Sequence, residues 1–366
     1  MFRELLVLCA MVIGVASFRQ LRPVRMPTQH FQRGLAMSTS TVETASFLQD
    51  VAKTAPPKRL GTLLKLLELD NNEDLVNPDE RKGLCPFLVP LSRNKQTGQY
   101  LCYIRWPTQK SDMDLQLVRT TDVGIVLEGM GTDQYCHRKV VERDFLAAPD
   151  APEMVKVLNA DGQMYSEGDY MSFLKSGKFD VSSEEGKNLV LDRYLLTKVG
   201  AFPDSFERLA DNFLKTGSDV SALVTCERAV SVFYGWGHPL TFHAKMLNGI
   251  PERGPEAKDC ARAAMGLPAW TVAKSEKDLD AVIDISGYKG GKKFLGEMHL
   301  YRSNDPREDE VGEGLSPVQV TLDQVAHFMD AVVLGAVEGG WEASKSKIAD
   351  MYKDGGYPEM AEFILS

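Results

Sequence analysis

The chain of 366 residues lacks the features of disulfide-built, membrane-spanning and nucleic-acid-binding proteins. It has only six cysteines, which are widely spaced and form no Cys-x-x-Cys pair. Its longest N-terminal apolar run, Leu5 to Val15, is too short to span a bilayer comfortably. Dense basic runs are absent after residue 36, and acidic residues outnumber basic ones by 51 to 42. These absences argue against a disulfide scaffold, a polytopic membrane protein and a general binder of phosphate backbones.

Linear motifs of catalysis are also missing. The stretch Lys289 to Lys293 lacks the spacing and the hydroxyl group of a phosphate-binding loop, so it predicts a basic exposed turn. Neither a dinucleotide-binding glycine fingerprint, a His-Glu-x-x-His zinc motif nor a Gly-x-Ser-x-Gly elbow occurs. The sequence therefore predicts no catalytic, cofactor-binding or metal-binding residues, although an active site assembled from distant segments would leave no linear motif.

A few titratable residues lie close enough in sequence to be weighed as sites: Cys136 with His137, His238 with His243, and Asp323 with His327. Adjacent residues on a helix point in different directions, and a separation of five rotates the second ligand away from the first. The pair four residues apart shares a helical face, where a solvated intrahelical pair is the common arrangement. An enzyme would need a deep pocket in which several of these residues converge, together with His299.

The first 36 residues have the composition of a targeting leader. Met1 to Ser17 combines an early arginine, an apolar stretch and a small-residue end, which is the layout of a secretory signal. Phe18 to Val42 is rich in arginine, serine and threonine, with no acid before Glu43, as in transit peptides. The motif Val15-Ala16-Ser17-Phe18 resembles the bipartite presequences of algae with complex plastids, such as diatoms. We interpret 1–36 as a signal plus transit peptide; the alternative is a plain signal peptide with an arginine-rich propeptide.

Removal of this leader changes the charge and the thiol count. The leader contains five arginines and one glutamate, so the remaining chain carries a formal charge of −13 where the whole chain carries −9. Cys9 is removed as well, which leaves an odd set of five cysteines that suits a reducing compartment such as the plastid stroma.

Periodicity divides the mature chain into three parts. Residues 37–83 predict a flexible segment with a short helix, including the Leu60 to Leu69 repeat. Residues 84–150 predict a small antiparallel sheet plus a helix from Thr132 to Ala147. The expected strands are 86–91, 99–105, 115–119 and 123–127, the first two joined by a five-residue connection at 94–98.

Residues 187–366 predict an array of helical hairpins, because apolar residues recur at intervals of three and four, with prolines near helix starts and glycines near helix ends. The eight expected helices span 189–199, 203–215, 219–233, 239–247, 255–265, 317–334, 341–353 and 358–365. The predicted fold class is therefore α+β: a small antiparallel β-sheet followed by a mostly α-helical array of stacked helical hairpins.

Two aromatic clusters are candidates for partner binding. One ends the predicted hairpin at Arg105 and Trp106, and the other joins two predicted helices at Tyr234, Trp236 and His238. Tryptophan and arginine are common anchors of protein interfaces. The competing use of such residues is packing in the core.

Four segments resemble a family of plant and algal chloroplast proteins: Leu101 to Thr108, Asp219 to Glu227, Ala257 to Ala264 and Val320 to Ala326. The similarity covers 84–366. The family is linked to biogenesis of the chloroplast ATP synthase, as stromal factors that help assemble its catalytic head. The resemblance implies a scaffold or chaperone role without a cofactor, with ATP synthase subunits as protein partners.

The predicted function is a non-enzymatic assembly or interaction factor of the plastid stroma, without nucleic acid as a partner and without an integral membrane segment in the mature chain. An enzyme, either a hydrolase or a transferase with a nonlocal active site, is one alternative. A helical-array RNA-processing factor is another, and the charge of −13 disfavours it. Peripheral association with thylakoids stays open.

Overall fold

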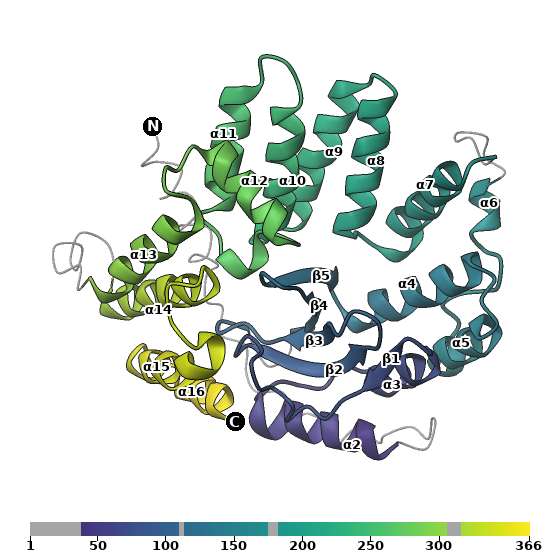
Figure 1. Cartoon of the computed structure of the whole chain (residues 1–366). Helices are drawn as coiled ribbons and strands as arrows, with labels where there is room; N and C mark the ends of the chain where they lie inside the picture. Colours follow the sequence, from purple (N-terminus) through teal and green to yellow (C-terminus); the bar gives the residue numbers. More distant parts are fainter. Residues whose placement is uncertain (1–37, 110–112, 175–181, 306–315) are drawn as a thin grey trace, which may run out of the picture. The chain divides into compact units, whose positions relative to one another are not determined.

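The structure, a computed structural model, describes residues 38–109, 113–174, 182–305 and 316–366, so the predicted leader at 1–36 lies outside the described residues. Near the N-terminus the chain forms a five-stranded antiparallel sheet whose strands follow one another in sequence order (Figure 1). The strands are β1 (Glu73–Leu75), β2 (Leu88–Asn94), β3 (Tyr100–Ile104), β4 (Gln116–Thr120) and β5 (Ile125–Gly129).

The predicted hairpin is confirmed between β2 and β3, where Leu88 pairs with Ile104. Asn94 initiates its turn, because its Oδ1 atom accepts hydrogen bonds from the backbone N–H groups of Gln96 and Thr97, each 3.0 Å long. Gly98 closes the turn with a φ of 73°, a conformation that side chains other than glycine rarely adopt.

The strand β1 was not predicted, because it has three residues and no β-branched side chain. A buried hydrogen bond of 2.7 Å from the Ser92 hydroxyl to the Glu73 carboxylate fixes it to β2. Arg119 on β4 also pairs with Glu73, 3.1 Å away. Polar contacts thus hold β1 at the edge of the sheet, although its sequence has no alternating hydrophobic pattern that would predict a strand.

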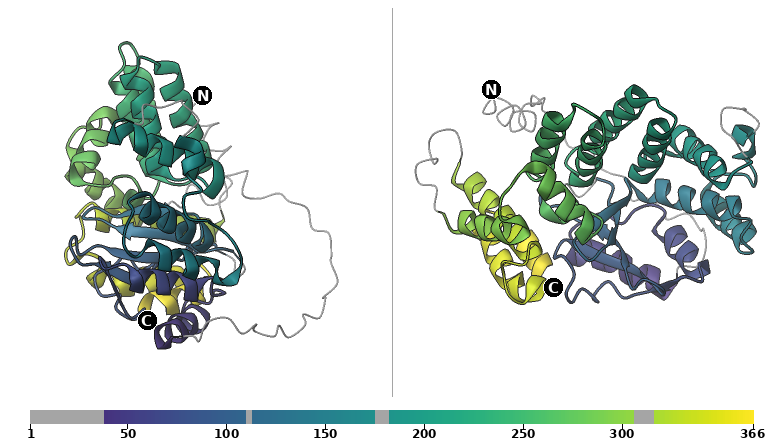
Figure 2. Two further views of the ribbon diagram at one scale, coloured as in Figure 1. Left: turned by 90° about the vertical axis from the view of Figure 1, so that its right-hand side faces the viewer. Right: turned by 45° about the horizontal axis from the view of Figure 1, so that its top comes forward.

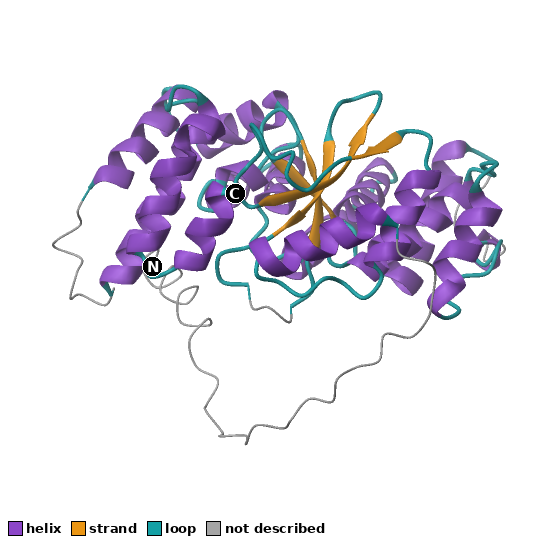
Figure 3. Cartoon of the chain, turned by 90° about the horizontal axis from the view of Figure 1, so that it is seen from below, coloured by secondary structure: helices purple, strands orange, loops and turns teal. Residues whose placement is uncertain are grey.

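Helices from the N-terminal half cover the sheet: α2 (Thr39–Ser46), the π-helical turn η1 (Phe47–Val51), α3 (Leu60–Leu69), α4 (Thr132–Phe145) and α5 (Ala151–Leu158). Figure 3 shows helices on both sides of the strands. The segment 37–83, predicted to be flexible with a short helix, contains α2, η1 and α3, and α3 has the bounds of the predicted Leu60 to Leu69 repeat; the segment completely buries Leu48 and Ala52 in the core around the sheet. Apolar contacts with the sheet order a sequence that is polar on average.

The remaining chain is helical and packs mostly as pairs of consecutive helices. After η2 (Asn159–Asp161) and α6 (Met171–Leu174) come α7 (Glu184–Tyr194), η3 (Leu195–Val199), α8 (Pro203–Lys215), α9 (Asp219–Val232), α10 (Gly237–Asn248), α11 (Gly254–Ala264), η4 (Ala269–Thr271), α12 (Glu276–Ser286), α13 (Gly291–Asn304), α14 (Pro317–Val333), α15 (Gly340–Asp354) and α16 (Pro358–Leu365). Hairpin partners are α8 with α9, α10 with α11, α13 with α14, and α15 with α16. The predicted fold class, a small antiparallel sheet followed by stacked helical hairpins, is confirmed.

Helices with strong end signals match their predicted bounds closely. Proline occupies the first turn of α8, α11, α14 and α16. A capping box between Ser316 and Gln319 starts α14. Helices α5, α6, α12 and α13 were not predicted; glycines with positive φ lie at the end of α12 (Gly287) and at the start of α13 (Gly290 and Gly291).

The short helix η4 joins the sheet to the helical array. Its Trp270 carbonyl lies against Gly124 in the turn between β4 and β5, and the Trp270 ring meets the Phe87 ring at 6.1 Å. The hydroxyl of Thr271 accepts the backbone N–H of Gly237, at the start of α10, at 3.1 Å. In Figure 1, α8 to α12 lie above the strands, and Figure 2 shows the same helices from two other directions.

The last helix is fixed to the start of the sheet by Arg81, which is 2% exposed. Its Nε atom donates to the Leu88 carbonyl at 2.9 Å, and Nη1 donates to the Phe363 carbonyl at 2.6 Å. Burial lowers the pKa of Arg81 to about 10. Phe47 and Leu48, near the start of the described chain, and Phe363 and Ile364, near its end, belong to the same core.

Within the described ranges, every helix is too short or too polar to cross a bilayer.

Candidate protein interface

The five residues predicted to bind a partner lie in different environments. Arg105, Trp236 and His238 are buried, and Trp106 is half-buried. Tyr234 alone among them is largely exposed, at 69%. A direct role in partner binding stays a prediction for all five, and Tyr234 offers the accessible surface that such a role requires.

The structure brings Trp106 and Trp236 together, although 130 positions separate them in sequence. Their rings meet edge to face, with centroids 5.8 Å apart. The indole N–H of Trp106 donates to Oε1 of Gln116 at 2.9 Å, and the neighbouring Arg105 donates through Nε to the Ala52 carbonyl at 3.1 Å. The ring contact joins the sheet to the helical array, and the two hydrogen bonds fix Trp106 and Arg105 within the N-terminal part of the fold; both are packing roles.

His238 takes part in a polar cluster between α8 and α10. Its Nε2 atom lies 2.8 Å from Oε1 of Glu207, and Lys274 donates to Oε2 of the same carboxylate at 2.6 Å. Burial raises the pKa of Glu207, but the hydrogen bond with His238 and the charge of Lys274 outweigh it and hold the pKa below its usual range. The carboxylate therefore stays ionised and holds three segments together.

The outer face of α9 exposes apolar side chains. The helix buries Ala222, Leu223 and Cys226, whereas Val220 is 76% and Val224 is 57% exposed. The two valines are four residues apart and so share one face of the helix. We call Val220, Val224 and the exposed Tyr234, which follows α9, the α9 surface. Contiguous exposed apolar area is typical of protein-binding sites, and the two valines supply such area on one helical face.

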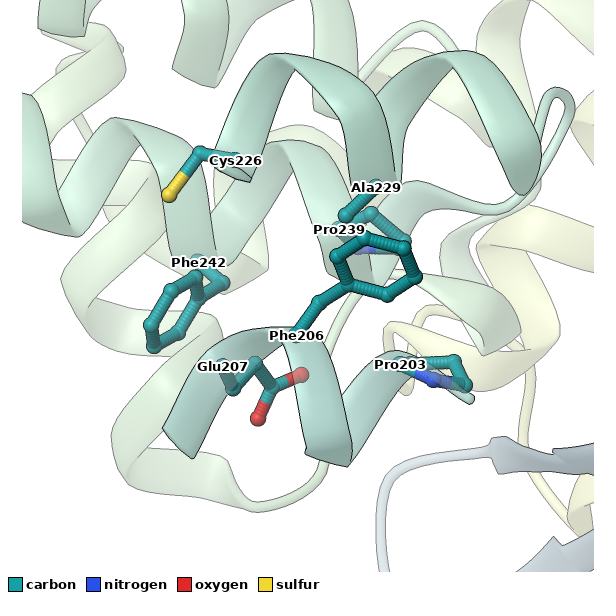
Figure 4. A pocket seen from close by; sticks show the side chains of 7 residues that line it. All are labelled: Pro203, Phe206, Glu207, Cys226, Ala229, Pro239 and Phe242. Carbon is teal, nitrogen blue, oxygen red and sulfur yellow. The ribbon is translucent and has the colours of Figure 1, made fainter. Parts of the chain in front are cut away.

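The space between α8, α9 and α10 is nearly filled by side chains. A cavity there is lined by Phe206, Glu207, Cys226 and Phe242, together with Ala229 and two prolines (Figure 4). Its volume of about 10 Å³ is room for about one water molecule. This cavity is part of the packing between helices and does not admit an organic substrate.

A larger groove of about 500 Å³ lies beside the N-terminus of α4. Its walls are formed by residues 55–58, 113–115 and 130–134. Two methionines, Met113 and Met130, are 53% and 38% exposed at this groove. Flexible methionine side chains adapt to varied apolar partners.

The cysteine, histidine and aspartate residues that the sequence analysis considers as parts of an active site do not line either of these two cavities. Cys136 is completely buried, which raises the pKa of its thiol and keeps it protonated. Burial likewise lowers the pKa of His137 on α4 and of His243 on α10. These residues do not assemble into a nucleophile and base.

Two of the weighed histidines do meet. Nδ1 of His299 on α13 lies 3.0 Å from Nδ1 of His327 on α14, and Asp330 is beside them. His299 and His327 are both among the residues whose convergence the sequence analysis considers, but their pairing and the place of Asp330 beside them are not predicted, because His299 is 28 positions from His327 along the chain. The spacing of three between His327 and Asp330, which places both on one helical face, was the available signal.

Comparison with known proteins gives matches along nearly the whole chain. Three family profiles match in order: PAB N-terminal at 42–183, PAB middle domain at 203–289 and PAB C-terminal domain at 297–366. A protein of Arabidopsis thaliana described as "Protein IN CHLOROPLAST ATPASE BIOGENESIS, chloroplastic" is 32% identical over 356 residues, which cover 96% of this chain and 99% of the relative. No solved structure matches the chain significantly.

Proposed function

Because the chain belongs to the PAB family, and its Arabidopsis relative is named for chloroplast ATPase biogenesis, we propose that it is a plastid assembly factor for the chloroplast ATP synthase. The observation that carries the proposal is the extent of the similarity, which spans nearly all of both chains. A shared domain alone would support only a shared fold, whereas a match over nearly the whole of both chains supports the same order of domains, from which we infer a related role.

The stroma is the place where we expect it to act. The relative is described as chloroplastic. The composition of residues 1–36, a secretory-type signal followed by an arginine-rich and serine-rich stretch, supports import into a plastid that lies behind an additional membrane. In that compartment thiols stay reduced, which agrees with the free cysteines of the described chain.

We propose that the α9 surface contacts an ATP synthase subunit before that subunit is incorporated into the enzyme. Unassembled subunits expose the apolar faces that later become subunit interfaces. Val220 and Val224 offer apolar area, and Tyr234 adds an aromatic ring with a polar end, a residue type enriched at binding hot spots. Covering the apolar face of an unassembled subunit in this way requires binding and release but no chemical reaction.

Affinity capture tests the proposal. The tagged chain is incubated with plastid stroma at low salt, and the retained proteins are identified by mass spectrometry. We expect ATP synthase subunits to be retained by the wild-type chain and lost with the double variant Val220→Asp/Val224→Asp, because two charges in the apolar patch oppose its desolvation.

A matched double variant controls for the effect of the added charges. Val42→Asp/Val318→Asp makes the same two changes at exposed valines on α2 and α14, which are 52% and 44% exposed. This control is expected to retain the subunits as the wild type does. Absence of every ATP synthase subunit from the wild-type capture contradicts the proposed partner, and equal loss in both variants contradicts the proposed surface.

A further inference from the structure

Three potential metal ligands converge between α13 and α14. Nδ1 of His299 lies 3.0 Å from Nδ1 of His327 and 3.4 Å from Oδ2 of Asp330. The three ligand atoms all lie within 4.8 Å of one another. The group combines two imidazoles and one carboxylate, a donor set that occurs in zinc enzymes with three protein ligands.

The distances suit a tetrahedral ion. Ligand atoms about 2.0–2.1 Å from Zn²⁺ are roughly 3.3 Å apart when the geometry is tetrahedral. The two distances from Nδ1 of His299, 3.0 Å to His327 and 3.4 Å to Asp330, are close to that value. The third distance joins His327 to Asp330. His327 is less buried than the other two residues, so its ring can move to shorten this distance when an ion binds.

The surroundings hold the ligands in place. Oδ1 of Asp330 accepts the backbone N–H of Ala269 at 2.7 Å, which turns Oδ2 toward the histidines. Nε2 of His327 lies 4.0 Å from the carboxylate of Asp323, one turn earlier on α14. This separation is too long for a hydrogen bond, so Asp323 acts on the His327 ring through its charge; a carboxylate near a metal-binding histidine is a recurrent feature of zinc sites.

The charges favour a cation at this position. Asp330 is 6% exposed, and the protein groups that the structure places at its two oxygens are the Ala269 amide and His299. A buried carboxylate without a permanent positive charge beside it is costly. A divalent ion between the three side chains would supply that charge and would accept a lone pair from each of them.

We propose that His299, His327 and Asp330 bind one Zn²⁺ ion, with the fourth position left to water or to a partner's side chain. The ion would fix α13 to α14 and, through Asp330 and Ala269, to η4. It would stabilise the part of the chain that matches the C-terminal family profile. This site is independent of the α9 surface and of the proposed ATP synthase partner.

Metal titration of the whole chain tests this inference. The purified chain is stripped with EDTA, exchanged into buffer with a non-thiol reductant, and titrated with Zn²⁺ by calorimetry and with Co²⁺ by visible absorption. We expect one Zn²⁺ per chain, the visible band of tetrahedral Co²⁺, and a rise in the thermal midpoint on zinc addition.

Variants distinguish this site from the thiols and from misfolding. We expect His327→Ala and Asp330→Asn to lose the Co²⁺ band and the zinc-dependent rise in the thermal midpoint, and His243→Ala, on α10, to keep both. Circular dichroism of each metal-free variant checks that it is folded, and His327→Ala changes the least buried ligand. Absence of zinc binding by the wild type overturns the proposal, as does binding of unchanged affinity and stoichiometry in a folded His327→Ala variant.

Discussion

Individual charged residues between α4, α7 and α8 form a partly buried ion-pair cluster. Asp204 receives two hydrogen bonds from Arg138, of 2.9 and 2.6 Å, and a third of 2.9 Å from Arg208. Arg138 also bonds Glu142, and Arg208 bonds Asp192. Bidentate hydrogen bonds between an arginine and a carboxylate are stronger than isolated surface ion pairs. Here they fix the relative position of three helices.

The cluster makes stability depend on pH. Burial raises the pKa of Asp204, but Arg138 and Arg208 outweigh it and hold the pKa well below its usual range. Because the unfolded chain takes up the proton near pH 4 and the folded chain does so only at lower pH, the stabilisation is present above about pH 4 and is lost as pH falls further.

We therefore expect Asp204→Asn to reduce the free energy of unfolding by about 2–3 kcal/mol at pH 7, since two arginines lose an ionised partner. The difference from the wild type should shrink as pH falls from 4 toward 2, while Glu142 and Asp192 are retained in both proteins. Urea unfolding of both proteins at pH 7, 4 and 3 measures this difference in the free energy of unfolding. A difference that stays constant with pH would show that the Asp204 charge is not the source of the stabilisation.

At the scale of elements, η4 is the connection on which the arrangement of sheet and helices depends. Three of its groups contact different parts of the fold: Ala269 contacts α14, Trp270 contacts the turn between β4 and β5, and Thr271 contacts α10. A 3₁₀ helix of three residues gains little from its own hydrogen bonds, so its position depends on these tertiary contacts.

Gly124 allows the closest of these approaches. A Cβ atom at this position would lie 2.1 Å from the Trp270 carbonyl oxygen, and φ is +157°. We expect Gly124→Ala to destabilise the protein by about 2 kcal/mol or more, because the backbone of η4 must move away from the sheet. Differential scanning calorimetry measures the change.

Gly217→Ala is the matched control for Gly124→Ala. Gly217 also has a positive φ, +74°, but open space surrounds the position of its Cβ. Its substitution is expected to cost about 1 kcal/mol from backbone strain alone. An equal loss of stability in the two variants would contradict a specific role for the contact between the turn and η4.

Features that depend on neighbouring residues in the sequence could be predicted, whereas features that depend on long-range contacts could not. Local signals such as the first-turn prolines of α8 and α16 and the Asn94 turn gave helix starts and a hairpin correctly. Long-range contacts left no local signal: Trp106 meets Trp236, and His299 meets His327, only after the helices have packed. The sequence could thus indicate the fold class, but not which candidate residues are buried and which are accessible.

At the scale of the whole molecule, the chain combines one core shared by its two described ends with an outer layer of helices. Arg81 joins α16 to the sheet, and η4 joins the sheet to α10 and α14. The α9 surface lies on a helix that packs against α8 and α10, so its backbone is ordered before a partner binds, which limits the entropy lost when a partner docks.

The most direct test of the proposed function is replacement of the Arabidopsis relative. The mature chain, fused to a plant plastid transit peptide, is expressed in Arabidopsis lacking that protein, and the amount of assembled chloroplast ATP synthase is measured by native gel and immunoblot. Re-expression of the relative serves as the reference, and a photosystem subunit as the internal standard. We predict that the chain raises ATP synthase toward the reference level, and that Val220→Asp/Val224→Asp does not. If the wild-type chain accumulates in the plastid and ATP synthase stays at the level of the mutant, the proposed function is contradicted.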